Sequence, residues 1–325
     1  MPTLFSGPVK CNPKDVVIEK INDGAAACAF RISRTFSIPD GTEYLQSGTR
    51  RSGKAADIRV DTVVTLGLND RHVRCQATIH NTVSEHRLRL SLPTGITGGS
   101  YKANQAYCFV ERGVGPDRST GDWKEPETGY KGFESILYKR SADGGGLAFI
   151  SAYGLHECYG ADDIEGTLYI TMIRAFKNTV STDGQPDGGL IGESRYDFIL
   201  KPLLPSDSDA DLIRLQSSLA CGIYTRTTRV NRPDKTTDSF MNVQSDNVIV
   251  TTVKPPYENS DKAAIVRLCN YSDKASTAKI TFKQKIKKVI QTNLLEEKES
   301  ELKASANFFT ATLSKHKIAT FRIEF

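Results

Sequence analysis

The segment at residues 79–96 (IHNTVSEHRLRLSLPTGI) holds His86, Arg87 and Arg89, which form the most suggestive group of polar side chains in the chain. An imidazole can move protons near neutral pH, and the planar fork of arginine binds carboxylates and phosphates. In the same segment leucine alternates with arginine or serine, and the leucines are Leu88, Leu90 and Leu92. Because side chains alternate across a β-strand, we expect the leucines to face a core and the arginines to face away from it. Arg87 and Arg89 are therefore predicted either to join this sheet to a neighbouring domain or to contact substrate.

Three further side chains are candidates for a substrate cleft or an inter-domain contact, namely Arg112, Trp123 and Arg174. Trp123, with Tyr130 nearby, lies in a long glycine-rich loop at residues 113–132, where an exposed ring could stack on a sugar. Arg174 shares a predicted strand face with Leu168, Ile170 and Met172. Since a buried charge is costly without a partner, we expect a carboxylate or a backbone group beside Arg174.

No residue pattern in this chain predicts an active site of its own. The five histidines form no HxH, HxD or HExxH arrangement, and there is no GxSxG elbow and no activated cysteine context. Adjacent carboxylates such as Asp162 and Asp163 point to opposite faces of a strand, so they cannot flank a glycosidic bond. A loop site at His156 and Glu157 stays open, as does a carboxylate pair formed only in three dimensions. We predict no catalytic residue, no metal ligand and no cofactor in this segment.

The bulk properties of the chain favour a soluble globular protein of one large or two medium domains. It has 325 residues, 38% hydrophobic residues and a formal net charge of +5. No segment combines Lys/Arg clusters with stacking aromatics, and no run is long and apolar enough for a membrane span, so neither nucleic acid nor a membrane is an expected partner. Seven scattered cysteines, none in CxxC spacing, suggest a reducing compartment, and we predict a cytoplasmic location.

Strand patterns dominate the chain. Residues 60–68 and 72–80 form a predicted hairpin, extended by residues 87–92, and further strands are expected at 30–38, 146–151, 167–176, 195–200, 248–253, 263–269, 278–282 and 318–325. One helix is expected at residues 209–221, capped by Asp207 or Ser208. Long loops at 113–132 and 178–193 and a polar linker at 226–239 complete the pattern. These patterns predict a mainly β protein of two sandwich domains, at residues 1–235 and 236–325.

Four groups of short strings carry a family resemblance. They are Asn81 with Glu85-His86-Arg87-Leu88-Arg89 and Pro93-Thr94-Gly95-Ile96; Phe109-Val110-Glu111-Arg112; Gly146-Leu147-Ala148-Phe149 through Gly154-Leu155-His156-Glu157-Cys158, then Thr167-Leu168 and Met172-Ile173-Arg174; and residues 247–256, Arg267-Leu268-Cys269-Asn270, Asn293-Leu294-Leu295-Glu296-Glu297 and Thr320-Phe321-Arg322-Ile323. In this order they resemble the C-terminal β-region of glycoside hydrolase family 38, the α-mannosidases. The family typically has Asp and Phe where this chain has Glu85 and Leu92.

The resemblance covers residues from about 10 to 325 and implies a large antiparallel supersandwich, galactose mutarotase-like, followed by a smaller C-terminal β-sandwich. It implies that the first strands of the large sandwich lie upstream of Met1. Family members open with an α/β barrel, which binds zinc and carries the catalytic carboxylates, followed by a helical bundle. Neither segment has a counterpart in this sequence, so the resemblance implies that the barrel and the bundle, in the same or a split chain, are partners of this segment.

Three functions follow as expectations. The first is the non-catalytic C-terminal β portion of an α-mannosidase, which supports and borders an active site carried elsewhere and which is inactive alone. The second is a stand-alone carbohydrate-binding β-module. The third is an aldose-epimerase-like enzyme, which would need a histidine and a carboxylate converging in a groove.

Overall fold

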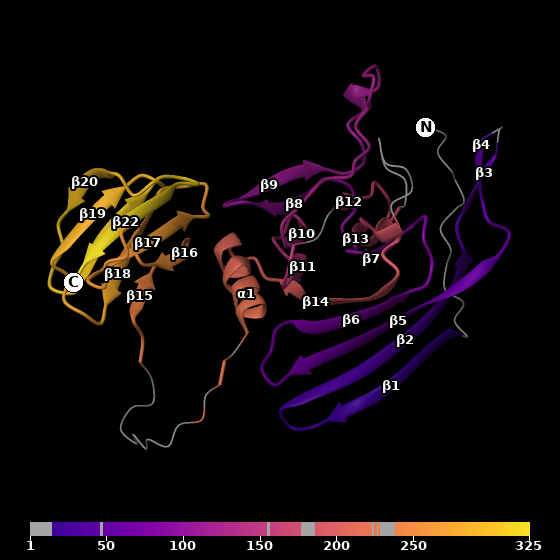
Figure 1. Cartoon of the computed structure of the whole chain (residues 1–325), viewed down its shortest axis with the longest axis horizontal. Helices are drawn as coiled ribbons and strands as arrows, with labels where there is room; N and C mark the ends of the chain where they lie inside the picture. The colour runs from indigo at the N-terminus through magenta and orange to yellow at the C-terminus, as the bar shows by residue number, and fades with distance from the viewer. Residues whose placement is uncertain are drawn as a thin grey trace. The chain divides into compact units, whose positions relative to one another are not determined.

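The computed structural model describes residues 15–45, 48–154, 157–176, 186–222, 224–225, 227 and 238–325. The chain divides into two compact units (Figure 1). The first consists of Met1–Ala103 and Glu111–Pro205, and the second of Asn104–Val110 and Ser206–Phe325. The domain boundary predicted at residue 235 lies outside the described residues and stays a prediction.

The first unit is built on a nine-stranded sheet, of which Asn104–Val110, at the turn from β8 to β9, is assigned to the second unit. Its strands, in spatial order, are β1 (Val16–Asp23), β2 (Ala27–Pro39), β5 (Ala55–Gly67), β6 (Val73–Asn81), β14 (Gly192–Leu203), β11 (Gly146–Ser151), β10 (Ile136–Arg140), β8 (Ser100–Gln105) and β9 (Cys108–Gly113). A second sheet has the order β12 (Cys158–Gly160), β13 (Leu168–Ala175) and β7 (His86–Leu92), and β3 (Thr42–Leu45) with β4 (Gly48–Arg51) forms a separate hairpin.

Alternating apolar side chains from the two larger sheets form one core. Ala77 and Ile79 of β6 and Phe149 of β11 lie in the same buried cluster as Leu168 and Ile170 of β13. Leu88 and Leu90 of β7 pack against this cluster, and Leu92 is part of it. The predicted inward direction of these leucines is confirmed, because the alternation in residues 87–92 matches the two-residue repeat of a strand.

The predicted hairpin is confirmed as the antiparallel pair β5–β6, but its extension by residues 87–92 is wrong. β7 belongs to the second sheet, where it pairs with β13. The chain turns away from the first sheet after Asn81, and Glu85, immediately before β7, has a φ of 62°. Asn81 stabilises this crossing, because its amide donates to the carbonyl of Leu190 at 2.9 Å and its Oδ1 accepts from the amide of Val83 at 3.2 Å.

The second unit is a smaller sandwich, whose strands run from orange to yellow in Figure 1. One sheet has the order β16 (Val248–Lys254), β17 (Ala263–Asn270), β22 (Ile318–Glu324), β19 (Lys288–Thr292) and β20 (Lys298–Leu302). The other has the order β15 (Met241–Gln244), β18 (Ser276–Phe282) and β21 (Phe308–Leu313). Leu268, Phe282, Phe309 and Phe321 lie in the core that the two sheets share. The mainly β prediction is confirmed.

The helix α1 spans Asp209–Cys221, as the sequence predicts. Of the two proposed caps, Ser208 is the one that the structure uses, because its side chain accepts from the amide of Asp211. The Asp211 carboxylate accepts in return from the amide of Ser208 at 3.0 Å, which completes a capping box. No helix among the described residues is both long and apolar enough to cross a membrane.

Candidate functional site

The outer face of β7 and β13, opposite the leucines, carries a cluster of arginine and tyrosine side chains. We call Arg87, Arg89, Arg174, Tyr130 and Tyr169 the arginine–tyrosine face. The guanidinium carbon of Arg87 lies 4.4 Å from the centroid of the Tyr130 ring, and that of Arg89 lies 4.7 Å from the centroid of Tyr169. Arg89 is also 5.9 Å from the Tyr130 centroid, so the guanidinium groups and rings alternate along the face. Such stacking stabilises a cation and fixes the plane of the guanidinium group.

Among the described residues, Arg87 is the arginine of this face that has a carboxylate partner. Its Nε lies 3.1 Å from Oε1 of Glu157, although the two atoms are not aligned as a hydrogen bond. The Glu157 carboxylate also accepts from the hydroxyl of Thr171 at 2.9 Å. Because both side chains are largely buried, with 23% of Arg87 and 14% of Glu157 exposed, the pair is screened less than a surface ion pair.

Arg89 is held by tyrosine rather than by a carboxylate. Its Nη1 donates to the hydroxyl of Tyr130 at 3.2 Å. In the described part of the chain no carboxylate lies within ion-pair distance of Arg89. The guanidinium group therefore keeps its charge uncompensated while its orientation is fixed by Tyr130 and Tyr169.

The predicted inward position of Arg174 is wrong, whereas its predicted partner stays a prediction. β13 has a bulge between Thr171 and Ile173, so Ile173, rather than Arg174, continues the inward row of Leu168 and Ile170. Arg174 is exposed and lies opposite Arg87 in the strand pair. Its contact among the described residues is the ring of Phe176, at 5.6 Å, and no carboxylate or backbone oxygen there binds it.

His86 does not share the face of Arg87 and Arg89. It is only 5% exposed and shares the inward parity of the leucines, so the strand places it on the opposite face from Arg87 and Arg89. Its ring makes no well-aligned hydrogen bond among the described residues, although the backbone of Ser84 lies close enough to act on it. Burial lowers the pKa of the His86 imidazole, and the nearby charge of Arg51 lowers it further. The spacing His86, Arg87, Arg89 thus does not assemble one site.

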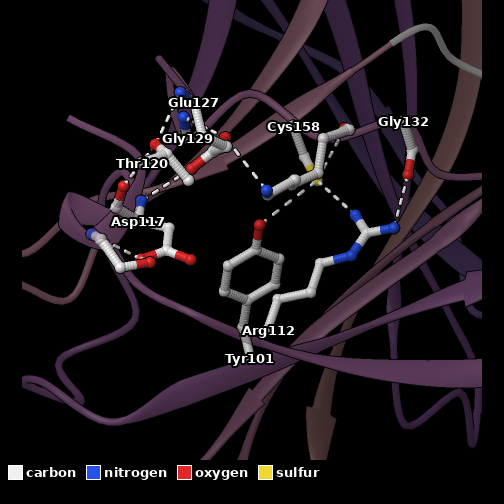
Figure 2. Close-up of polar contacts among 10 residues, drawn as sticks. Tyr101, Arg112, Asp117, Thr120, Glu127, Gly129, Gly132 and Cys158 are labelled. Carbon is white, nitrogen blue, oxygen red and sulfur yellow. Dashed lines mark hydrogen bonds and ion pairs between the residues drawn. The ribbon is translucent and has the colours of Figure 1, made fainter. Parts of the chain in front are cut away.

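The loop between β9 and β10 contributes Tyr130 and is held in shape by Glu127 (Figure 2). One Glu127 oxygen accepts from the amide of Asp117 at 2.7 Å, and the other accepts from the amide of Gly129 and pairs with Lys131 at 3.0 Å. The amide of Glu127 donates to the hydroxyl of Thr120 at 2.9 Å. Partial burial raises the pKa of the Glu127 carboxyl, but these hydrogen bonds outweigh it and the pKa lies below its usual value.

Arg112 contacts the C-terminal end of this loop. Figure 2 shows its guanidinium group between Gly132 and Cys158. Its Nη2 donates to the carbonyl of Gly132 at 2.7 Å, and its Nη1 lies 3.7 Å from the sulfur of Cys158. The sulfur is also 4.0 Å from the Tyr101 hydroxyl. Burial raises the pKa of the Cys158 thiol in spite of Arg112, so this buried thiol is not activated as a nucleophile.

Trp123 stands at the exposed part of the same loop. It is 65% exposed, and its amide donates to the carbonyl of Thr120 at 3.0 Å. Its neighbours Asp122, Lys124 and Glu125 are exposed as well. The ring is therefore presented to solvent by a backbone that Glu127 and Thr120 hold.

Two clusters that the sequence did not single out involve titratable groups. His80 on β6 lies 3.6 Å from carboxylates of both Asp61 and Glu193, which pair in turn with Arg59 and Arg195. Lys139 on β10 is 1% exposed, and its Nζ has no hydrogen-bond partner among the described residues. Burial lowers the pKa of the Lys139 amine, against the attraction of Asp163 and Asp162. Cross-strand register, which spacing alone does not reveal, places His80 opposite Glu193, whereas Asp162 and Asp163 belong to the loop between β12 and β13.

No group of three or more His, Cys, Asp or Glu side chains that could hold a metal ion occurs among the described residues. His156 lies outside them, as do residues 178–185 of the second predicted loop. The residues that the structure describes therefore do not fit the zinc that the family resemblance implies for the complete enzyme.

The chain is similar in sequence and in fold to known proteins. Residues 247–321 match the family model described as the C-terminal beta sandwich domain of glycosyl hydrolases family 38. A protein of Halalkalibacterium halodurans named putative mannosylglycerate hydrolase is 26% identical over 202 residues, which cover 57% of this chain and 21% of that protein.

Two solved structures from Enterococcus faecalis share the fold over 95% of this chain. One is a protein in glycosyl hydrolase family 38, with a TM-score of 0.78 and 18% identity, of which this chain covers 36%. The other is an alpha-mannosidase, with a TM-score of 0.80 and 19% identity, of which this chain covers 35%. The chain thus spans little more than a third of the length of these two structures.

Proposed function

Because the chain carries the C-terminal β-sandwich domain of glycosyl hydrolase family 38, we propose that it is the non-catalytic β portion of an α-mannosidase. The observation that carries the proposal is that almost the whole chain corresponds to one part of a longer protein. The fold of the Enterococcus faecalis alpha-mannosidase is shared over 95% of this chain, which spans 35% of that protein. In this proposal the remaining part of the complete enzyme, the barrel and the helical bundle, carries the catalytic carboxylates and the zinc.

The arginine–tyrosine face is the surface through which the β portion borders the active site. Arg89 and Arg174 have guanidinium groups without a carboxylate partner among the described residues, which suits a contact outside this chain segment. The complete enzyme would hydrolyse α-mannosides. The name of the Halalkalibacterium halodurans relative makes mannosylglycerate one of the substrates to test.

The test of this proposal is an activity measurement with and without the catalytic part. The purified chain, supplied with zinc, is expected to leave an aryl α-mannoside intact. Mixing or co-expression with the barrel and bundle of a family 38 enzyme is expected to give hydrolysis that neither part shows alone. Hydrolysis by the chain alone would contradict the non-catalytic role, and a barrel–bundle part that is fully active without this chain would contradict the supporting role.

The exposure of Trp123 favours a second candidate, a carbohydrate-binding β-module. An indole ring on an ordered loop can stack on the apolar face of a sugar at little cost in conformational entropy. Retention of the chain on a mannan column, lost in Trp123→Ala, is the result expected for this function. Catalysis of galactose mutarotation would instead favour the aldose-epimerase-like alternative.

A further inference from the structure

We propose that the arginine–tyrosine face is a binding site for the carboxylate or phosphate group of a small anionic sugar. The anion site can be tested on this chain alone, whereas the choice of a sugar as the rest of the ligand rests on the proposed function, in which this face borders the active site. The observations that carry the site are a local excess of positive charge, the register of two arginines, and the rings that orient them.

The first observation is the charge on the face. It holds three guanidinium groups, and among the described residues the carboxylate paired with one of them is that of Glu157, beside Arg87. Of the carboxylates that act on the neighbouring Tyr159, Glu127 is paired with Lys131, and Asp162 is exposed. Glu157 is further occupied by the hydroxyl of Thr171. Arg89 and Arg174 have no carboxylate within ion-pair distance in the described ranges, so the face carries a surplus of positive charge that an anion would neutralise.

The second observation is that Arg174 and Arg87 lie directly opposite each other across β13 and β7. Like charges in this cross-strand position destabilise a sheet. The bulge between Thr171 and Ile173 produces the juxtaposition, because it turns Arg174 out of the core row and onto the face of Arg87. An anion between two such groups converts the repulsion into two charge-assisted hydrogen-bonding interactions.

The third observation is that aromatic rings fix the guanidinium planes before any ligand arrives. Tyr130 lies 4.4 Å from Arg87, Tyr169 lies 4.7 Å from Arg89, and Phe176 lies 5.6 Å from Arg174. Stacking occupies the faces of the guanidinium groups and leaves N–H groups at their edges for a planar carboxylate or a phosphate. Because the side chains are already ordered, little rotamer entropy is lost on binding.

The partial burial of Arg87 favours a small ligand over an acidic protein surface. Arg87 is only 23% exposed, and Tyr130 of the loop between β9 and β10 stacks against its guanidinium group. A carboxylate or phosphate on a sugar can reach such a group, whereas a flat protein surface reaches mainly Arg174. The tyrosine hydroxyls add donors and acceptors suited to sugar hydroxyl groups.

The test is calorimetric titration of the whole chain with D-glycerate, mannose 6-phosphate and the neutral methyl α-mannoside. We expect one or both anions to bind, at least tenfold more tightly than the neutral sugar, with affinity that falls as salt is added. Arg89→Gln and Arg174→Gln are expected to weaken anion binding at least tenfold each. Arg195→Gln, which removes an exposed arginine of β14 paired with Glu193, is the matched control and should leave binding unchanged.

Thermal unfolding of each variant checks that the sandwich is intact, and Arg89→Lys separates charge from geometry, since lysine keeps the charge without the planar fork. Equal binding by wild type, Arg89→Gln and Arg174→Gln would overturn the site. Absence of anion binding at millimolar concentration would do the same. Poly-aspartate is titrated in parallel, and its binding without binding of either small anion would also overturn the site, because it would indicate a protein partner. None of these results touches the activity test of the proposed function, so the two can fail separately.

Discussion

Gly166 leaves no room for a side chain beside Ile96, because a β-carbon on residue 166 would lie 1.8 Å from the Ile96 carbonyl oxygen. Gly166 also has a φ of 58°, which side chains of L-residues disfavour. The hydroxyl of Thr94 donates to the Gly166 carbonyl at 2.8 Å, and the amide of Thr94 donates to the Glu165 carbonyl at 3.2 Å. The turn before β13 and the loop after β7 are therefore packed backbone to backbone.

Gly166→Ala is expected to destabilise the protein by about 3 kcal/mol or more, since strain at positive φ and a backbone clash add together. Gly95→Ala is the matched control: Gly95 has a φ of 70°, but a β-carbon there meets nothing within 4 Å. Its cost should be about 1–2 kcal/mol, from the backbone conformation alone. Urea unfolding followed by circular dichroism measures both, and equal losses would contradict the close approach of Gly166 to Ile96.

Lys139→Met is expected to raise the stability of the first unit by roughly 1 kcal/mol or more. The buried amine of Lys139 lacks a hydrogen-bond partner among the described residues, whereas methionine fills a similar volume without a charge. Lys288→Met, which removes an amine paired with Glu301 at 2.9 Å, serves as the control and should not stabilise. The midpoint of thermal unfolding reports the difference, and a loss of stability in Lys139→Met would show that the amine has a favourable partner.

Glu127→Gln is expected to loosen the loop that carries Trp123. The substitution removes the negative charge that Lys131 and the amides of Asp117 and Gly129 bind. Trp123 is the one tryptophan of the chain, so its fluorescence anisotropy reports this loop directly, and it should fall in the variant. Glu125→Gln changes an exposed carboxylate of the same loop and should leave the anisotropy unchanged.

The same loop should respond to acid in a defined direction. The pKa of Glu127 is lowered in the folded chain, so its contribution is complete above the ordinary glutamate pKa, about 4.3, and is lost as the pH falls through the lower folded value. The anisotropy of Trp123 should therefore drop only in the acid range below about pH 4.3. A fall in anisotropy near neutral pH would contradict this account.

His86→Leu is expected to remove part of the acid sensitivity of the first unit. The pKa of the buried His86 imidazole is lowered, so the unfolded chain binds a proton more readily than the folded one. Stability from this group is complete above the ordinary histidine pKa, about 6.5, and is lost as the pH falls below it. Unfolding free energies measured between pH 8 and pH 5 should decrease less in His86→Leu than in wild type. Identical slopes would exclude a role for His86.

Sequence patterns predicted the elements whose own apolar side chains recur with a regular period. They failed where pairing with another strand decides the local structure. The leucines of β7 and the period of α1 indicate their structures directly. β20 (Lys298–Leu302) has no apolar alternation and is a strand because it pairs with β19. The bulge in β13 is equally invisible in composition, although it reverses the direction of Arg174.

The candidate site shows the same division. The outward direction of Arg87 and Arg89 follows from the period of the strand, and the structure confirms it. Their partners Tyr130 and Glu157 come from segments that are distant in sequence, and no spacing rule connects them to β7. Sequence thus indicated which arginines lie on the face, while tertiary contacts determine which rings and carboxylate surround them.

The second unit includes Asn104–Val110, and this has a consequence for how the protein is made. The carbonyl of Tyr107 lies 3.5 Å from the sulfur of Cys269, and the ring of Phe109 packs edge-on against Tyr271 at 6.5 Å. During synthesis from the N-terminus, this short segment is therefore made long before the residues of the second unit that it contacts. Both sheets of the C-terminal sandwich come from the continuous stretch at residues 241–324, but its contacts at Cys269 and Tyr271 need a segment made more than a hundred residues earlier, so a cleavage between the two stretches would cut the second unit into two pieces of chain.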